Sequence, residues 1–122
     1  MIKNTSMQPR RSFIFVPGLR PDMFPKALAS GVDIVCVELE DGIAPKDKAE
    51  ARQKALALFS KPQPNDGVER IVRINSMREK FGIEDVNAIL STKTPPPALM
   101  MPKVRSPDAV SYTHLTLPTN LS

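Results

Sequence analysis

Strand and helix signals alternate along this chain, and that regular order limits its possible folds more than any other feature. Strand-forming runs begin near residues 12, 32, 69 and 98, and segments with helical spacing separate them. The order βαβαβαβ favours right-handed crossovers between parallel strands. We therefore predict a parallel α/β sheet, either an open doubly wound sheet or part of a (β/α)8 barrel. The alternation alone does not choose between the two.

The first strand and helix are separated by a turn. Residues 12–16 are rich in β-branched and aromatic side chains, and Pro17-Gly18 is a pair typical of turns. Asp22 is predicted to cap the helix that follows. Pro25 then falls in the first turn of that helix, where the missing N–H costs nothing.

The later elements follow the same scheme. Residues 32–40 form the second predicted strand, the Asp41-Gly42 turn follows, and Pro45 opens the second helix. Residues 69–75 and 98–101 are the third and fourth strands. Apolar residues at helical spacing mark the second and third helices: Ala51, Ala55, Leu58 and Phe59, then Ile83, Val86, Ile89 and Leu90.

The two ends of the chain depart from this pattern. Residues 1–11 are polar and basic without an apolar period, which predicts a flexible arm. One globular domain is expected over residues 12–110. Residues 111–122 contain no charged side chain and match no strand spacing, so we interpret them as a non-native tail. The alternative is a genuine short C-terminal strand, because this segment is rich in Thr and Leu.

Composition excludes several classes of protein. The 122 residues include 17 basic and 13 acidic side chains, and the basic ones are scattered, so nucleic acid is not an expected partner. No run approaches the roughly 18 apolar residues of a membrane helix. Cys36 is the only cysteine, which excludes an internal disulfide and fits a reducing compartment. We expect a cytoplasmic protein that does not bind membranes.

Polar side chains gather at the ends of three predicted strands. Strand alternation places five of them on the inward faces, at the C-terminal mouth of a closed barrel: Glu38, Glu40, Arg73, Asn75 and Lys103. Barrel enzymes have their active sites at this mouth. The alternative is a purely structural ion pair between Glu40 and Arg73. We favour function, because inward charges cost several kcal/mol in desolvation and three strands carry them to the same end.

Two sequence blocks and two short segments resemble the HpcH/HpaI aldolase and citrate lyase superfamily, nearest to its citrate lyase beta subunit type. The blocks are VPG-x-RPD, beginning at residue 16, and LEDG-x-AP-x-DK-x-x-AR, beginning at residue 39. VRIN and MPKV follow in the family's order, and the resemblance covers roughly residues 10–108. It implies a (β/α)8 barrel. Because such a barrel needs about 250 residues, we expect the N-terminal half of a TIM barrel, strands 1 to 4 only.

The resemblance also implies an activity. Members of this family use Mg²⁺ to cleave or form the carbon–carbon bond between the acetyl part of a coenzyme A thioester and a 2-oxo acid, as in citryl-CoA and malyl-CoA. The chain is therefore expected to be part of a Mg²⁺-dependent carbon–carbon lyase, inactive on its own. Barrels of this family are often trimeric, so the complete enzyme is expected to be a homotrimer. The alternative is a noncatalytic α/β module that binds an anionic metabolite.

Four residues match positions with known roles in the family. Glu40 and Asp41 resemble the acidic pair that helps organise the water shell of the metal and the substrate, and are the expected catalytic residues. Arg73 resembles the arginine that binds the 2-oxo acid through its planar fork. Arg20 is similar to a basic residue that helps hold coenzyme A, with a plain solvated loop arginine as the alternative. No metal ligand is assigned, because the family's metal carboxylates come from strands five and six.

Overall fold

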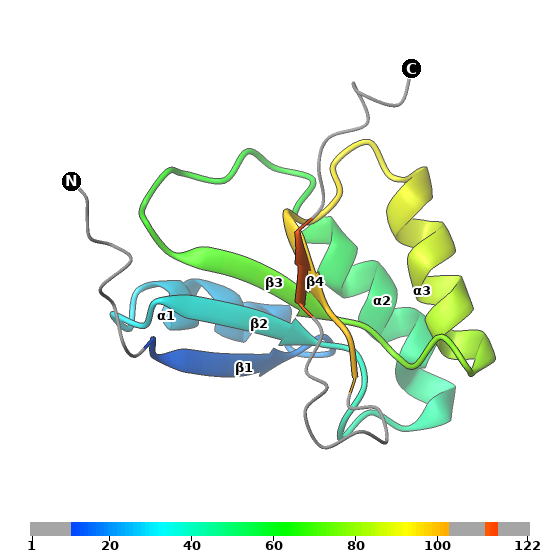
Figure 1. Cartoon of the computed structure of the whole chain (residues 1–122). Helices are drawn as coiled ribbons and strands as arrows, with labels where there is room; N and C mark the ends of the chain where they lie inside the picture. The colour runs from blue at the N-terminus through cyan, green and yellow to red at the C-terminus, as the bar shows by residue number, and fades with distance from the viewer. Residues whose placement is uncertain (1–10, 103–111, 115–122) are drawn as a thin grey trace.

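The computed structural model describes residues 11–102 and 112–114. Four parallel strands lie side by side in chain order: β1 (Phe13–Pro17), β2 (Ile34–Glu38), β3 (Glu69–Arg73) and β4 (Ala98–Met100). Their connections contain α1 (Phe24–Leu28), α2 (Lys48–Ala57) and α3 (Lys80–Ser91), which share one apolar core with a single face of the sheet (Figure 1). Sequential strand order with helices on one face is the arrangement of a (β/α)8 barrel, whereas a doubly wound sheet reverses its strand order and is covered on both faces.

The predicted elements are present, with different ends. Single-turn 3-10 helices precede two of the α-helices: η2 (Pro21–Met23) and η3 (Pro45–Asp47). Asp22 lies inside η2 and its side chain bonds to Arg20, so its prediction as a helix cap was wrong. Pro25 does lie in the first turn of α1. The second and third strands end at Glu38 and Arg73, two residues earlier than predicted, although the backbone N–H groups of Leu39 and Ile74 still donate to the adjacent strands.

The two faces of the sheet have different cores. The helix-facing core is the larger one, and the residues that the strands and the position after β3 contribute to it are Val16, Val35, Val37, Val72, Ile74 and Leu99. The opposite face carries a small cluster of Ile34, Cys36, Ile71 and Ala98. Alternation in the second strand is therefore as predicted. In the fourth strand it is reversed: the predicted inward position of Lys103 requires Leu99 and Met101 to face inward as well, but both pack with the helices. Lys103, predicted to share their face, lies outside the described residues.

Both predicted terminal segments lie mostly outside the described part of the chain. Residues 1–10 of the predicted arm are not described, and Arg11 forms an ion pair with Glu69 across 3.2 Å. Within the tail, Tyr112–His114 forms β5, which pairs antiparallel with β4. This agrees with the alternative prediction of a short C-terminal strand. That the tail is non-native stays a prediction, which sequencing the gene across codon 110 tests. No described helix is long and apolar enough to cross a membrane.

The first strand forms an open edge. In the described sheet β1 pairs with β2 alone, and its apolar side chains Phe13, Ile14 and Phe15 are 37–44% exposed. Unpaired strand edges with apolar side chains promote association between chains. We expect this chain to self-associate and Ile14→Lys to shift it toward monomer in sedimentation velocity experiments. Ile83→Lys, on the exposed side of α3, is the matched control and should not. A monodisperse wild-type monomer would contradict this prediction.

Candidate active site

The side chain of Arg73, the last residue of β3, meets three carboxylates. Its Nε donates to Oε1 of Glu38 at 3.0 Å, and its terminal Nη2 donates to the other Glu38 oxygen and to Asp41 at 3.1 Å. Oε1 of Glu40 lies 3.5 Å from Nε. We refer to these four residues as the Arg73 cluster. It unites three of the four site residues expected from the sequence, and it adds Glu38.

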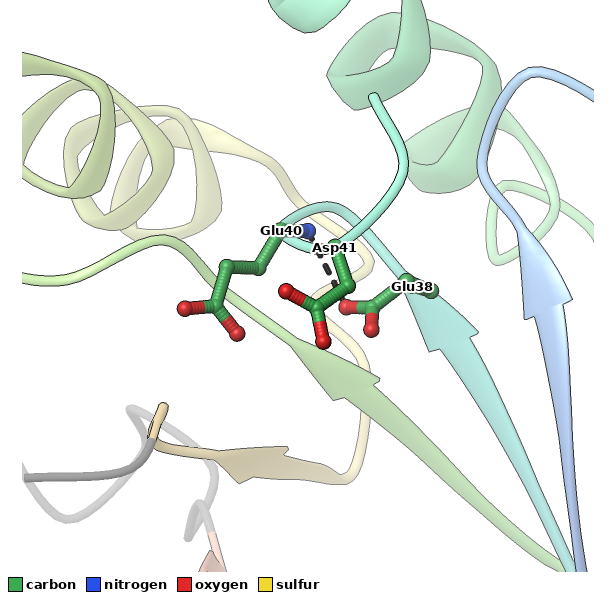
Figure 2. A group of neighbouring side chains, drawn as sticks. All are labelled: Glu38, Glu40 and Asp41. Atoms are coloured by element: carbon green, nitrogen blue, oxygen red, sulfur yellow. Dashed lines mark hydrogen bonds between the residues drawn. The ribbon is translucent and has the colours of Figure 1, made fainter. Parts of the chain in front are cut away.

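The sheet places the cluster at the carboxyl ends of its strands. Glu38 and Arg73 are register partners on adjacent parallel strands, so their side chains lie next to each other on one face. The ring of Phe15, on β1, lies 4.8 Å from the Arg73 guanidinium. Glu40 and Asp41 follow β2, and Figure 2 shows all three carboxylates turned toward the end of β3. Three neighbouring strands thus contribute to one site.

The side chains of the Arg73 cluster are buried to different degrees. The side chains of Glu38 and Arg73 are 8% and 13% exposed, whereas that of Asp41 is 79% exposed. Burial raises the pKa of the Glu40 carboxyl group above its ordinary value, and the positive charge of Arg73 opposes that rise. The hydrogen bond to Glu38 is the main reason that the pKa of Arg73 is raised, which keeps its guanidinium charged. A fixed cation beside a carboxyl group with a raised pKa suits the binding of an anion and the transfer of a proton.

The acidic side chains have the chemistry of a magnesium site. Glu38, Glu40 and Asp41 each offer an oxygen atom, and the three atoms lie within 4.8 Å of one another (Figure 2). Mg²⁺ prefers such oxygen ligands and keeps several of its waters. Arg73 bonds to both oxygens of Glu38, so the carboxylate oxygens that remain for a metal ion or its waters belong mainly to Glu40 and Asp41.

Asn75 does not belong to the cluster. It was predicted to share the inward face of Arg73, but its side chain is buried and bonds to Lys48 of α2 and Asp85 of α3. Alternation still holds at Ile74, which packs with the helices, and it fails at Asn75, two residues beyond the end of β3. The sequence analysis did not predict the hydrogen-bond network of Lys48, Asn75 and Asp85, which lies behind the Arg73 cluster. One signal was available: Asp85 precedes Ile89 by four residues and so lies on the buried side of α3.

Arg20 lies apart from the Arg73 cluster. It follows β1, its side chain is 61% exposed, and its guanidinium bonds to Asp22 at 3.0 and 3.1 Å. It lines a shallow groove of about 400 Å³ with Ile14, Lys26 and Ser30. In this structure Arg20 is thus an exposed loop arginine paired with Asp22.

Cys36 lies on the inward face two residues before Glu38. It is fully buried, and burial raises the pKa of its thiol to about 12. Only the thiolate reacts with alkylating reagents, and at pH 8 the folded chain should contain far less thiolate than a free cysteine does. We expect iodoacetamide to label Cys36 only as fast as the chain opens, and to label it at the ordinary thiol rate in urea. Fast labelling under native conditions would contradict this burial.

Comparison with known proteins agrees with the resemblance seen in the sequence. The model of the HpcH/HpaI aldolase/citrate lyase family matches residues 11–117. The chain belongs to this family. It is 32% identical over 104 residues to a human protein named mitochondrial citramalyl-CoA lyase, a match that covers 85% of this chain and 30% of that one. An L-malyl-CoA/beta-methylmalyl-CoA lyase of Cereibacter sphaeroides is 38% identical over 84 residues, which cover 68% and 26% of the two chains.

A solved structure shows the same fold. CitE of Mycobacterium tuberculosis in complex with magnesium, acetoacetate and coenzyme A is 32% identical and matches with a TM-score of 0.61. The match covers 79% of this chain and 33% of CitE. The four parallel strands thus correspond to the N-terminal portion of a CitE-like TIM barrel, which confirms the predicted fold class. The chain spans about a third of the length of the relatives it matches.

Proposed function

We propose that this chain is part of a Mg²⁺-dependent carbon–carbon lyase that acts on coenzyme A thioesters of the citryl and malyl type and yields acetyl-CoA and a 2-oxo acid. The Arg73 cluster is the observation that carries the proposal. A charged guanidinium, fixed at the mouth end of a barrel-type sheet, is a suitable partner for the carboxylate of an oxo acid. The names of the lyase relatives, and the magnesium and coenzyme A bound to CitE, support this choice of substrates.

The charges of the cluster support a divalent cation as cofactor. Three carboxylates against one guanidinium leave an excess of two negative charges. In our proposal Glu40 and Asp41 hold the water shell of Mg²⁺, while its direct ligands lie outside this chain. When bound, Mg²⁺ supplies Lewis-acid polarisation of the substrate oxygen. Arg73 orients the oxo acid, and the exposed Arg20 holds part of the coenzyme A moiety.

The test is turnover by the protein encoded by the uninterrupted reading frame. With Mg²⁺ it should release acetyl-CoA and an oxo acid from citryl-CoA, or from malyl-CoA or citramalyl-CoA, and chelation by EDTA should abolish release. The 122-residue chain alone should show no turnover. A complete, folded barrel that cleaves none of these thioesters would refute the proposal. Calorimetric binding of an acyl-CoA or an oxo acid to the 122-residue chain without Mg²⁺ would instead support a noncatalytic binding module.

Assembly and location belong to the same proposal. We propose a homotrimer for the complete enzyme, which light scattering after gel filtration tests directly. We also propose a cytoplasmic location, because a chain with a single cysteine forms no internal disulfide and fits a reducing compartment; the human relative is named as a mitochondrial protein. Fluorescence imaging of a tagged complete protein distinguishes the two compartments.

A further inference from the structure

A buried lysine lies directly behind the Arg73 cluster. Lys48, the first residue of α2, donates from Nζ to the backbone oxygen of Glu40 at 2.8 Å, to that of Leu39 at 3.3 Å and to Oδ1 of Asn75 at 2.6 Å. All three acceptors are uncharged. Burying an ammonium group costs several kcal/mol unless it is well paired, so packing alone does not explain a lysine at this position.

The three acceptors belong to the two segments that carry the cluster. Leu39 and Glu40 directly follow β2, which contributes the carboxylates, and Asn75 follows β3, which contributes Arg73. One ammonium group therefore joins the end of β2 to the end of β3. Its hydrogen bond to the backbone oxygen of Glu40 holds the main chain of a residue whose side chain belongs to the Arg73 cluster.

Asn75 is held from its other side as well. Oδ2 of Asp85 accepts from the backbone N–H of Asn75 at 2.9 Å and from its side-chain amide at 2.7 Å. Nε of Arg52 donates to the other Asp85 oxygen at 2.9 Å. The amide group can satisfy both neighbours in one orientation only, with its oxygen toward Lys48. The acceptor for Lys48 is thus fixed by α2 and α3 together.

We propose that Lys48 is a positioning residue, which holds the backbone after β2 and the segment after β3 at the separation at which Glu40 and Asp41 meet Arg73. The proposal rests on the proposed function in treating the Arg73 cluster as the substrate site. Lys48 touches no substrate in this role and acts through the backbone of Glu40. Its loss should loosen the cluster and leave the sheet intact.

The experiment is hydrogen exchange by NMR on the 122-residue chain with Ile14→Lys as background, which limits its expected self-association. Two protons report on the site: Hε of Arg73 and the backbone N–H of Glu40, which donates to Glu38 at 3.0 Å. In Lys48→Met both should exchange about tenfold faster or more, while the amide of Val72 inside β3 keeps its rate. Lys54→Met is the matched control, because Lys54 lies exposed on the same helix and pairs with Glu50. It should change none of these rates.

The conservative variant separates positioning from packing. Lys48→Arg keeps the charge and the donors and should restore most of the slow exchange at Arg73 and Glu40. If methionine prevents folding, Lys48→Gln, which keeps two donors without the charge, replaces it with the same expected result. Unchanged exchange at Arg73 and Glu40 in Lys48→Met, or in Lys48→Gln where it replaces methionine, overturns the proposal, and so does equal acceleration at Val72. Neither readout needs turnover, so the positioning role and the lyase function can fail separately.

Discussion

Replacing Arg73 with alanine should destabilise the folded chain by about 3–5 kcal/mol, the usual cost of removing one partner from a buried ion pair. The variant leaves the carboxylate of Glu38 buried without its guanidinium, next to Glu40 and Asp41. Urea unfolding at low protein concentration, followed by circular dichroism, measures the loss. Arg20→Ala is the control: its pair with Asp22 is exposed to solvent, so the urea midpoint of this variant should stay close to that of the wild type.

The loss should depend on pH in a definite direction. Burial raises the pKa of Glu40 in the folded chain above its pKa in the unfolded chain. The protonated carboxyl group therefore contributes to stability below the unfolded-state pKa, and this contribution is lost as the pH rises through the folded-state pKa. Arg73→Ala removes the cation that opposes this rise, so the pKa of Glu40 rises further. The pH range over which the stabilising contribution of Glu40 is lost then extends to higher pH. The variant should therefore be closest to wild type near pH 4 and furthest from it near pH 7. A destabilisation that is the same at both pH values would contradict a charge-based role for Arg73.

Asp85→Ala should cost about as much, although Asp85 lies outside the cluster. Its carboxylate is fully buried and accepts three hydrogen bonds, two from Asn75 and one from Arg52. Alanine would leave those donors buried without their acceptor, so we expect a loss of about 3–5 kcal/mol. Urea unfolding is again the measurement.

The adjacent residue provides a matched control. Glu84 precedes Asp85 on α3, pairs with the same Arg52 at 3.1 Å and is 48% exposed. Exposed ion pairs contribute little, so Glu84→Ala should cost less than about 1 kcal/mol. Similar losses in the two variants would mean that burial does not decide the contribution of these carboxylates.

The elements of this fold were predictable from local signals. Alternation of strand and helix runs gave the four strands and their connections, and the period of two in the second strand separated Val35 and Val37 from Cys36 and Glu38. The choice of a barrel came from the resemblance, and the sequential order of the strands agrees with it. Asp22 shows the limit of a local rule, since its nearest partner is the arginine two residues earlier and not a helix N–H.

The candidate site was predictable only in part. Glu40, Asp41 and Arg73 come together because register places the ends of neighbouring strands side by side, a regularity that sequence reasoning can use. Asn75 was misplaced because alternation was extended past the end of its strand. The contacts of Lys48 with Asn75, and of Asn75 with Asp85, join α2, the segment after β3, and α3. They depend on how the helices approach the sheet, which no spacing in the sequence records.

The antiparallel pairing of β5 affects how a barrel could be completed from two polypeptides. A separately expressed segment that carries later strands of a CitE-like barrel would have to join β4 in parallel, at an edge where Tyr112–His114 already pairs. Such complementation in trans therefore requires strand displacement first. A version of the chain that ends before residue 111 offers that edge without a competitor, and it is the better starting material for reassembly.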